Sequence, residues 1–375
     1  MKTHLTREQT DALEAELDAL RAEVTADLGA RDAAHIRGII RLARWNAIAG
    51  RSLLMFGITP ISWLAGVSTL GLAKILENME IGHNVMHGQY DWMNDPTLDS
   101  QTYEWDNVCD SGDWRHSHNY MHHTYTNILG KDLDVGYGVM RVADEQSWSP
   151  KHLFQPISNV ALSALFQWGV ALHDLDVSNN LSTPEGRREI RAHSGPFLRK
   201  AARQIFKDYV FFPAIAPWNA PRVLLGNLTA NLTRNVWTNV IIFCGHFPDG
   251  TQVYTEEETA NETRGEWYLR QMEGSANIEG SRWFHILSGH LSHQIEHHLF
   301  PDMPAHRYAE IAPRVRAICE NYGIRYNSGS FWKQYGSVLT GLVRRSVPKR
   351  AQAGGDLAPP QAGGGSTPPQ ELAAA

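Results

Sequence analysis

Apolar residues gather in two long stretches of the chain, and proline interrupts both of them. Residues 52–73 carry no charge, and as one helix they would be about 33 Å long, slightly more than the roughly 30 Å of a bilayer's hydrocarbon core. Because Pro60 divides this stretch and arginines precede it, we expect a hairpin that turns near Thr59 and returns to the same side of a membrane. The second stretch, residues 209–245, breaks at residues 217–221 and predicts a second hairpin.

This pattern predicts an all-α integral membrane protein with two helical hairpins, hence about four transmembrane helices, and a cytoplasmic helical cap. We expect a multi-pass protein of the inner membrane with its active site on the cytoplasmic side. Residues 153–173 are apolar too, but a basic segment follows them and basic segments stay in the cytoplasm, so we expect them to lie at the interface. The basic segment contains Arg187, Arg188, Arg191, Arg199, Lys200, Arg203 and Lys207.

The two ends of the chain differ from its centre. Residues 1–35 predict an amphipathic helix that begins with a capping box at residues 6–9. Residues 36–345 form the predicted membrane domain, and residues 346–375 are rich in Ala, Gly and Pro, which predicts a disordered tail. The apolar stripe of the first helix consists of Leu13, Leu17, Leu20, Val24 and Leu28.

Composition narrows the class of protein further. The 375 residues carry a formal net charge of −6, which argues against a nucleic-acid partner. The mean hydropathy of −0.35 is typical of soluble proteins, so the membrane prediction depends on the local pattern alone. Cys109, Cys244 and Cys319 are far apart in the sequence and provide no disulfide framework.

Many of the 18 histidines stand in spacings that suit metal binding. Side chains four residues apart lie on one face of an α-helix, so the two histidines of an H-x-x-x-H segment converge. Neutral imidazole binds redox metals, and the number of these histidines is about twice what one ion needs. The predicted ligands of two metal ions are His83, His87, His118, His122, His123, His246, His297 and His298.

The predicted metal is iron. Structural zinc sites favour cysteine, and the three cysteines stand apart from the histidine segments. Soluble di-iron bundles use mainly glutamate with some histidine, whereas histidine replaces carboxylate almost throughout here. A histidine-rich pair of Fe ions that reacts with dioxygen fits best.

Three segments then carry a family resemblance. HNVMH (83–87), HNYMHH (118–123) and QIEHHLFPDMPAHRY (294–308) resemble the three histidine boxes of the membrane fatty acid desaturase superfamily. The third box begins with glutamine, and in this it is similar to the third box of front-end desaturases. The longer strings HNVMHGQYDWMND and WRHSHNYMHHTYTN resemble mycobacterial-type acyl-CoA desaturases, and the resemblance covers roughly residues 36–335.

The resemblance implies a membrane di-iron enzyme that uses O2 to insert a cis double bond into a fatty acyl chain. It favours an acyl-CoA substrate and carbon 9, and it implies a separate NADPH-dependent flavin and iron-sulfur reductase. Two alternatives remain open. A membrane di-iron lipid hydroxylase would share the boxes, and a zinc-binding scaffold would consume no oxygen.

Several residues outside the eight histidines are secondary candidates. Gln294 is a candidate weak ligand, Glu80 a partner for an imidazole N–H, and Asn239 the last member of an asparagine ladder that leads towards His246. The roles of four histidines near the boxes stay open: His116, His285, His290 and His293. Candidates for contact with the phosphates of CoA are Arg187, Arg188 and Arg191.

Overall fold

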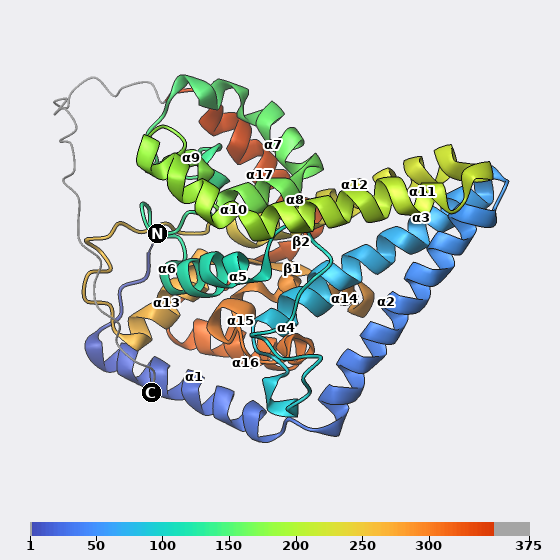
Figure 1. The fold of residues 1–375 in the computed structure, drawn as a ribbon. Helices are drawn as coiled ribbons and strands as arrows, with labels where there is room; N and C mark the ends of the chain where they lie inside the picture. Colours follow the sequence, from blue (N-terminus) through green and yellow to red (C-terminus); the bar gives the residue numbers. More distant parts are fainter. Residues whose placement is uncertain (1, 349–375) are drawn as a thin grey trace.

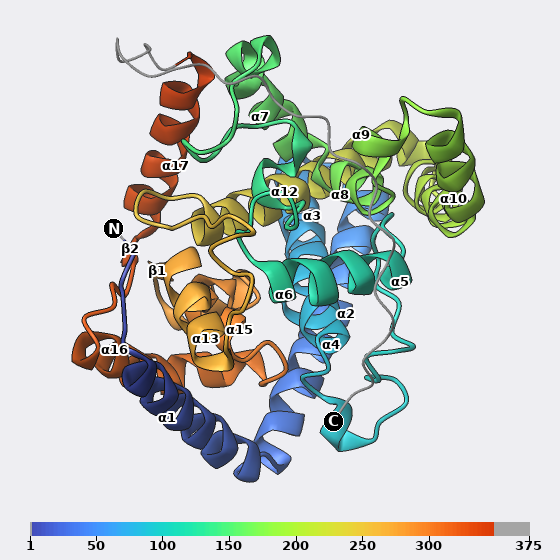
Figure 2. The same ribbon diagram turned by 90° about the vertical axis from the view of Figure 1, so that its left-hand side faces the viewer.

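The computed structural model describes residues 2–348, and helices make up most of it (Figure 1). The prediction of an all-α chain needs one small change, because β1 (Asn277–Glu279) and β2 (Ser328–Ser330) pair as a short parallel sheet with Asn277 opposite Ser328. Long helices project from a body of shorter helices towards one corner of the molecule (Figure 1), and in the view turned by 90° the shorter helices lie in front of them (Figure 2).

The first hairpin forms where the sequence predicts it. Helix α2 (Ala30–Phe56) ends just before the turn, and α3 (Pro60–Ile75) begins with proline in its first turn. The Thr59 hydroxyl caps α3 by accepting a hydrogen bond from the Ser62 amide at 3.1 Å. The two helices approach closely at Gly50, where an added Cβ would lie 2.6 Å from the backbone nitrogen of Leu70.

The second hairpin has unequal arms. Its first arm is short. It consists of the π-helical turn η6 (Phe206–Phe211) and α11 (Phe212–Ala214), and the chain then turns at η7 (Pro217–Asn219). Its second arm is α12 (Ala220–His246), which packs beside α3. The long helix α10 (Pro184–Ile205) leads into this hairpin and carries the basic segment.

The prediction of four transmembrane helices is wrong. Within residues 2–348, no helix unites the length and the apolar character that crossing a bilayer requires. Proline causes part of this difference, because Pro60 leaves α3 with 16 residues, or about 24 Å. Helices α2 and α12 have 27 residues each, but α2 contains several arginines and α12 contains Arg222, Arg234 and four asparagines.

A buried ionic network joins the two hairpins. The carboxylate of Asp208 accepts hydrogen bonds from Lys74 at 2.8 Å, Arg51 at 3.0 Å and Asn231 at 3.0 Å. Burial opposes ionisation of Asp208, but Lys74 and its other cationic neighbours hold the pKa of this carboxyl below its usual value. Arg51, which directly precedes the uncharged run 52–73, is therefore paired.

The N-terminal end of the described chain contains the expected capping box. Helix α1 (Arg7–Ala26) begins with the predicted capping box between Thr6 and Gln9. Its buried stripe, from Leu13 to Val24, packs against α13 (Arg264–Gly274) and α16 (Tyr308–Asn321). Helix α17 (Phe331–Ser346) closes the described part, so the predicted tail lies outside it from residue 349 onwards.

Shorter elements complete the body and hold the histidine segments. They are η1 (Leu76–His83), α4 (Asn84–Met86), η2 (Asp91–Met93), α5 (Ser111–Trp114), η3 (Arg115–His122), α6 (His123–Tyr125), η4 (Val135–Gly138), η5 (Pro150–Phe154), α7 (Gln155–Ala164), α8 (Phe166–Asp174), α9 (Val177–Asn180), α14 (Arg282–Leu287), η8 (Leu291–His293), α15 (Gln294–Leu299) and η9 (Ala305–Arg307).

Candidate metal centre

The first two histidine segments lie in π-helical turns. η1 contains His83, and η3 contains His118 and His122. The histidine spacing predicts a regular α-helix, whereas π-helical turns widen the helix and often occur at functional sites. The pairs still converge as expected: ring centroids are 4.6 Å apart for His83 and His87 and 5.1 Å apart for His118 and His122.

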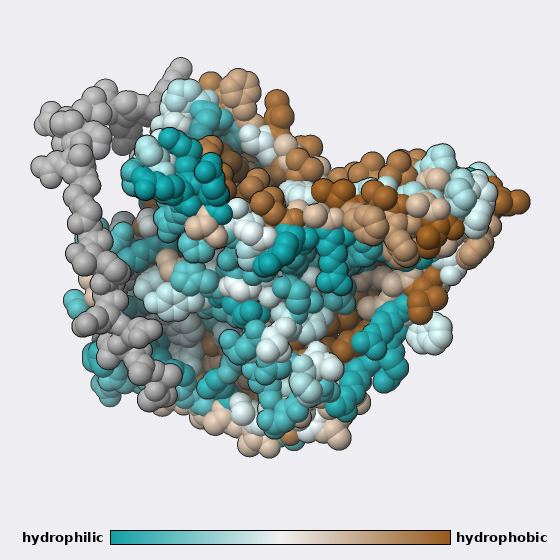
Figure 3. Space-filling model, viewed as in Figure 1, coloured by the Kyte–Doolittle hydropathy of each residue, from teal (hydrophilic) through white to brown (hydrophobic). Residues whose placement is uncertain are grey.

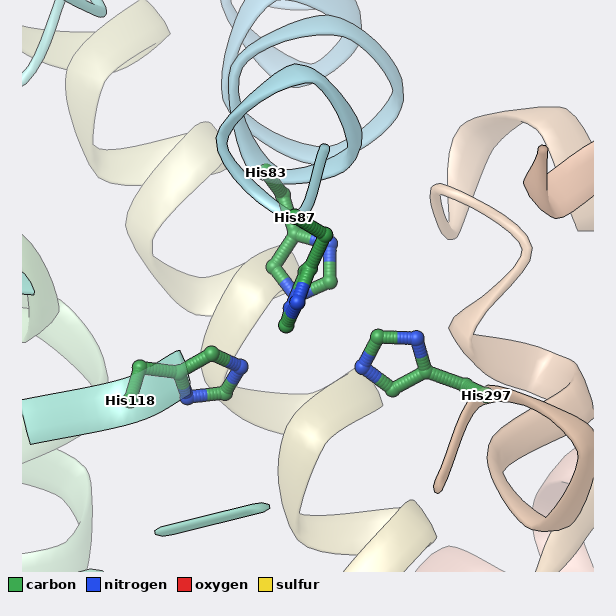
Figure 4. Close-up of side chains that lie close together, drawn as sticks. All are labelled: His83, His87, His118 and His297. Carbon is green, nitrogen blue, oxygen red and sulfur yellow. The ribbon is translucent and has the colours of Figure 1, made fainter. Parts of the chain in front are cut away.

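Seven of the eight predicted ligands form two groups whose ligand atoms lie within 4.8 Å of one another. The first group unites His83, His87, His118 and His297 around a common point (Figure 4). The second group unites His122, His246 and His298. The eighth histidine, His123, lies between them, with ring centroids 4.7 Å from His87 and 4.5 Å from His298.

The free nitrogens of these rings fit metal ions. Buried polar atoms in folded proteins almost always have a hydrogen-bond partner. In the described part of the chain, a buried Nδ1 of His246 and both ring nitrogens of His123 lack one. So do buried Nε2 atoms on five further predicted ligands, which are His87, His118, His122, His297 and His298. So many unpartnered imidazole nitrogens on converging rings are the donor set that metal ions would satisfy.

The electrostatics keep most of these rings neutral, as metal ligation requires. Burial, with a smaller contribution from His118, lowers the pKa of His83 to about 3. Burial and the neighbouring imidazoles likewise hold the pKa of His87, His123 and His297 well below the usual value. His122 differs: burial acts against its protonation, but Asp132 and Asp134 raise its pKa.

Polar side chains orient the rings through their other nitrogen. Nδ1 of His83 lies 3.0 Å from the Asn84 amide oxygen, and Nδ1 of His298 lies 3.0 Å from the Gln271 amide oxygen. Tyr308 lies 3.4 Å from Nδ1 of His297. Partners of this kind fix the tautomer and direct the opposite nitrogen towards a metal.

Two aspartates that the sequence argument missed support the second box. Both carboxylate oxygens of Asp132 lie 3.1 Å from Nδ1 of His122. An oxygen of Asp134 lies 3.6 Å from the same atom and 3.8 Å from Nδ1 of His118. His173 donates to Asp134 at 2.8 Å, and this bond raises the pKa of His173 to about 9 although burial opposes the shift. The Asp-Leu-Asp sequence soon after the second box was the available signal.

The secondary candidates have mixed outcomes. Gln294 lies within the centre, with its amide nitrogen 2.9 Å from Nε2 of His246. Glu80 does not contact the first box as expected, because its carboxylate binds His35 at 2.9 Å and His290 at 2.8 Å. Asn239 is buried and its amide nitrogen has no partner among the described residues. Its predicted role, in support of the ligands or as a weak ligand, stays a prediction.

None of the four further histidines belongs to either group of converging rings in the described chain. His290 is held by Glu80, and His285 lies 2.7 Å from the Ser292 hydroxyl. His293 packs on His285 with ring centroids 4.6 Å apart. His116 is exposed and stacks on Tyr120.

A cavity adjoins the histidine groups. His83, His118, His122 and His246 form part of its wall. Four aromatic side chains also line the cavity, namely Trp105, Trp114, Tyr137 and Phe166, together with polar residues. The cavity thus borders the predicted metal positions, and most of its exposed wall is apolar.

Comparisons with known proteins agree with this geometry. The family model described as "Fatty acid desaturase" matches residues 60–330. "NADPH-dependent stearoyl-CoA 9-desaturase" of Mycobacterium tuberculosis is 47% identical over 351 residues, which are 92% of this chain and 82% of that protein. "sn-1 linoleoyl-lipid 6-desaturase" of Synechocystis is 27% identical over 70% of this chain and 74% of its own. Human "Fatty acid desaturase 3" is 27% identical over 62% of this chain and 48% of its own.

Fold and site together define a helical protein whose converging histidines can hold metal beside an apolar cavity. The chain belongs to the fatty acid desaturase family. It is an oxidoreductase that introduces a double bond into a fatty acyl chain.

Proposed function

We propose that this desaturase acts on fatty acyl-CoA, converts stearoyl-CoA to its cis-9 product, and uses two Fe ions. The observation that carries the metal part is the set of buried imidazole nitrogens without partners on two groups of converging histidines. The substrate part rests on the M. tuberculosis relative, which is named as a stearoyl-CoA 9-desaturase.

Iron is the metal that this donor set favours for the reaction. Zinc also binds imidazole but has no redox chemistry, whereas removal of two hydrogens from an alkyl chain is an oxidation. The two groups of histidines would each hold one ion, with His123 between them. Bound iron would supply the activation of dioxygen that this oxidation needs.

The protein's own residues hold the ligands and the substrate. Asp132, Asn84 and Gln271 fix imidazole orientation through Nδ1. Trp105 and Trp114 line the cavity beside the histidines, where they exclude water from the acyl chain and hold its methylenes near the metal positions. No carboxylate needs to act as a conventional acid or base on the chain itself.

We also propose that the protein is bound to the inner membrane, with the histidine-bearing body on the cytoplasmic side. Exposed apolar side chains cover the projecting corner, where the space-filling view is brown (Figure 3). A contiguous apolar surface of this kind is typical of contact with lipid or protein. Members of this apolar surface include Trp45, Ile48, Phe56, Ile58, Ile61, Leu64, Trp218, Leu225 and Leu228.

Removing apolar side chains from the projecting corner should weaken membrane binding. Ile58 and Ile61 are 83% and 79% exposed beside the first turn. The double variant Ile58→Glu/Ile61→Glu should lower the partition into phospholipid vesicles at least tenfold, because each isoleucine contributes roughly 1.5–3 kcal/mol when buried. Vesicle flotation measures this. Leu181→Glu, an exposed leucine ahead of α10, is the control, and equal flotation of all three proteins would contradict the proposal.

Charge reversal on α10 tests the proposed contact with CoA phosphates. Arg187, Arg188 and Arg191 are exposed at the start of this helix, and guanidinium suits phosphate. Arg188→Glu/Arg191→Glu should raise the apparent KM for stearoyl-CoA about tenfold and leave iron content unchanged. Arg7→Glu/Arg21→Glu on α1 is the matched reversal elsewhere. An unaltered KM with weaker vesicle binding would instead assign these arginines to lipid headgroups.

A further inference from the structure

Arg234 is a cation buried inside the protein without a carboxylate partner. Its side chain is about 2% exposed, halfway along α12. The two carboxylates whose charges reach it are both engaged elsewhere, Asp208 with Arg51 and Lys74, and Asp106 with Lys207. A buried charge without compensation is costly. Its retention therefore calls for an explanation that the fold alone does not provide.

Neutral amides hold the guanidinium in place. Nε donates to the Asn235 amide oxygen at 2.9 Å, and Nη2 donates to Gln167 of α8. Neither of these bonds uses Nη1. One turn further along α12, the hydroxyl of Thr238 is buried and lacks a partner among the described residues.

These donors border the same cavity as the histidines. Arg234, Thr238 and Gln167 line it together with His83, His122 and His246. Arg234 and His246 are separated by 12 positions on one helix, which is about 18 Å along its axis. This separation leaves room for several methylenes between a group bound at Arg234 and carbons beside the metal positions.

From this arrangement we infer that Arg234 and Thr238 form a subsite for the carbonyl oxygen of the acyl thioester. The inference rests on the proposed acyl-CoA substrate and assigns the polar end of that substrate to a place in the cavity. A thioester carbonyl accepts hydrogen bonds and carries no charge that must be desolvated. Fixing it at Arg234 sets the register of the chain, so that mid-chain carbons rather than carbons next to the carbonyl meet the metals.

The basic residues near the cavity support this orientation of the acyl-CoA. Lys207 and Gln204, near the end of α10, bind Asp106 in the loop that supplies Trp105 and Asn107 to the cavity wall. Beyond the thioester, the CoA moiety would thus meet the side of the molecule that bears the basic helix α10. The opposite direction would place an apolar methyl end against a desolvated guanidinium, which is unfavourable.

A binding experiment on the wild-type protein tests the subsite without turnover. Stearoyl-CoA is compared with S-octadecyl-CoA, the thioether in which a methylene replaces the carbonyl. Without an electron donor neither ligand is consumed, and equilibrium titration gives both affinities. We expect stearoyl-CoA to bind at least tenfold more tightly, since hydrogen bonds to charged groups are the strong ones.

Arg234→Met should reduce this preference to within about twofold, because it keeps side-chain length and removes every donor. Arg222→Met is the matched control, on the same helix but bonded to the Thr59 backbone carbonyl, and should keep the wild-type preference. A second readout is product position: Arg234→Met should give a mixture of double-bond positions, because the carbonyl no longer fixes the register.

Three results would overturn the subsite. Equal wild-type affinities for the two ligands would do so without any variant, and so would an unchanged preference in Arg234→Met. A variant that keeps a single double-bond position but accepts longer chains would place Arg234 at the methyl end instead. If wild-type protein bound neither ligand, the acyl-CoA substrate itself would fail, which is a different outcome.

Discussion

Replacing His297 by alanine is expected to abolish desaturation and to lower the metal content of the purified protein. This ring meets His83, His87 and His118 at one point, and its buried Nε2 has no partner in the described structure. Loss of a residue that merely orients a ligand typically costs about 10–100-fold in metal affinity or activity, so loss of the ligand should cost more. Metal analysis and turnover of stearoyl-CoA by the same preparation measure both effects.

The matched control is His116→Ala. This exposed histidine lies two residues before His118 but belongs to neither group, so its loss should leave activity and metal content near wild type. The same loss as for His297 is expected for the other seven histidines: His83, His87, His118, His122, His123, His246 and His298. Full turnover in two or more of these variants would contradict the ligand assignment.

Purified protein supplied with stearoyl-CoA and oxygen should stay inactive until an electron donor is added. Reduction of O2 to water takes four electrons, of which the two broken C–H bonds supply two, so two must come from outside. The M. tuberculosis relative is named as NADPH-dependent, and we propose a separate NADPH-dependent flavin and iron-sulfur reductase. Product per NADPH consumed, with and without the reductase, measures the requirement.

His297→Ala with the complete reductase system is the control for that experiment, because it keeps the donor and removes a ligand. It should oxidise little NADPH and form no product. Sustained turnover by the wild-type chain with NADPH alone would mean that the chain accepts electrons directly, and a separate reductase would then be unnecessary.

Much of the metal centre could be predicted from the sequence because histidine spacing is a local property. His83 and His87 converge within one helical segment, and so do His118 and His122, whether the turn is α or π. The hydrogen-bond partners of these rings lie far away in the sequence, so local spacing could not predict them. Gln271 and Tyr308 reach His298 and His297 only through the packing of α13 and α16 on α15.

The prediction of transmembrane helices failed because length and apolar character do not occur together in one helix of the described chain. Both arms of the hairpin that turns near Pro60 were expected to cross a membrane, but α3 has only 16 residues and α2 contains several arginines. Glu80 was assigned to the first box by its proximity in sequence, yet its carboxylate faces α2 and the loop before the third box, at His35 and His290. Sequence distance along a helix does not decide which neighbouring element a side chain meets.

The environment of Arg234 could not be predicted from the sequence. In the sequence it is one arginine in an apolar stretch, where pairing with an acid is the usual expectation. Only the structure shows that Asp208 and Asp106 are bound to other cations and that the guanidinium borders the cavity. The proposed binding of the thioester carbonyl explains why this guanidinium is buried, whereas the stability of the fold does not.

The central claim is most directly tested by the product of a single defined reaction. Iron-loaded protein, reductase, NADPH, oxygen and stearoyl-CoA are combined, and the released fatty acids are separated and identified by gas chromatography with mass spectrometry. We expect cis-9-octadecenoate in the wild-type reaction and none with His297→Ala. Hydroxystearate as the main product, or octadecenoate formed equally by the variant, would contradict it.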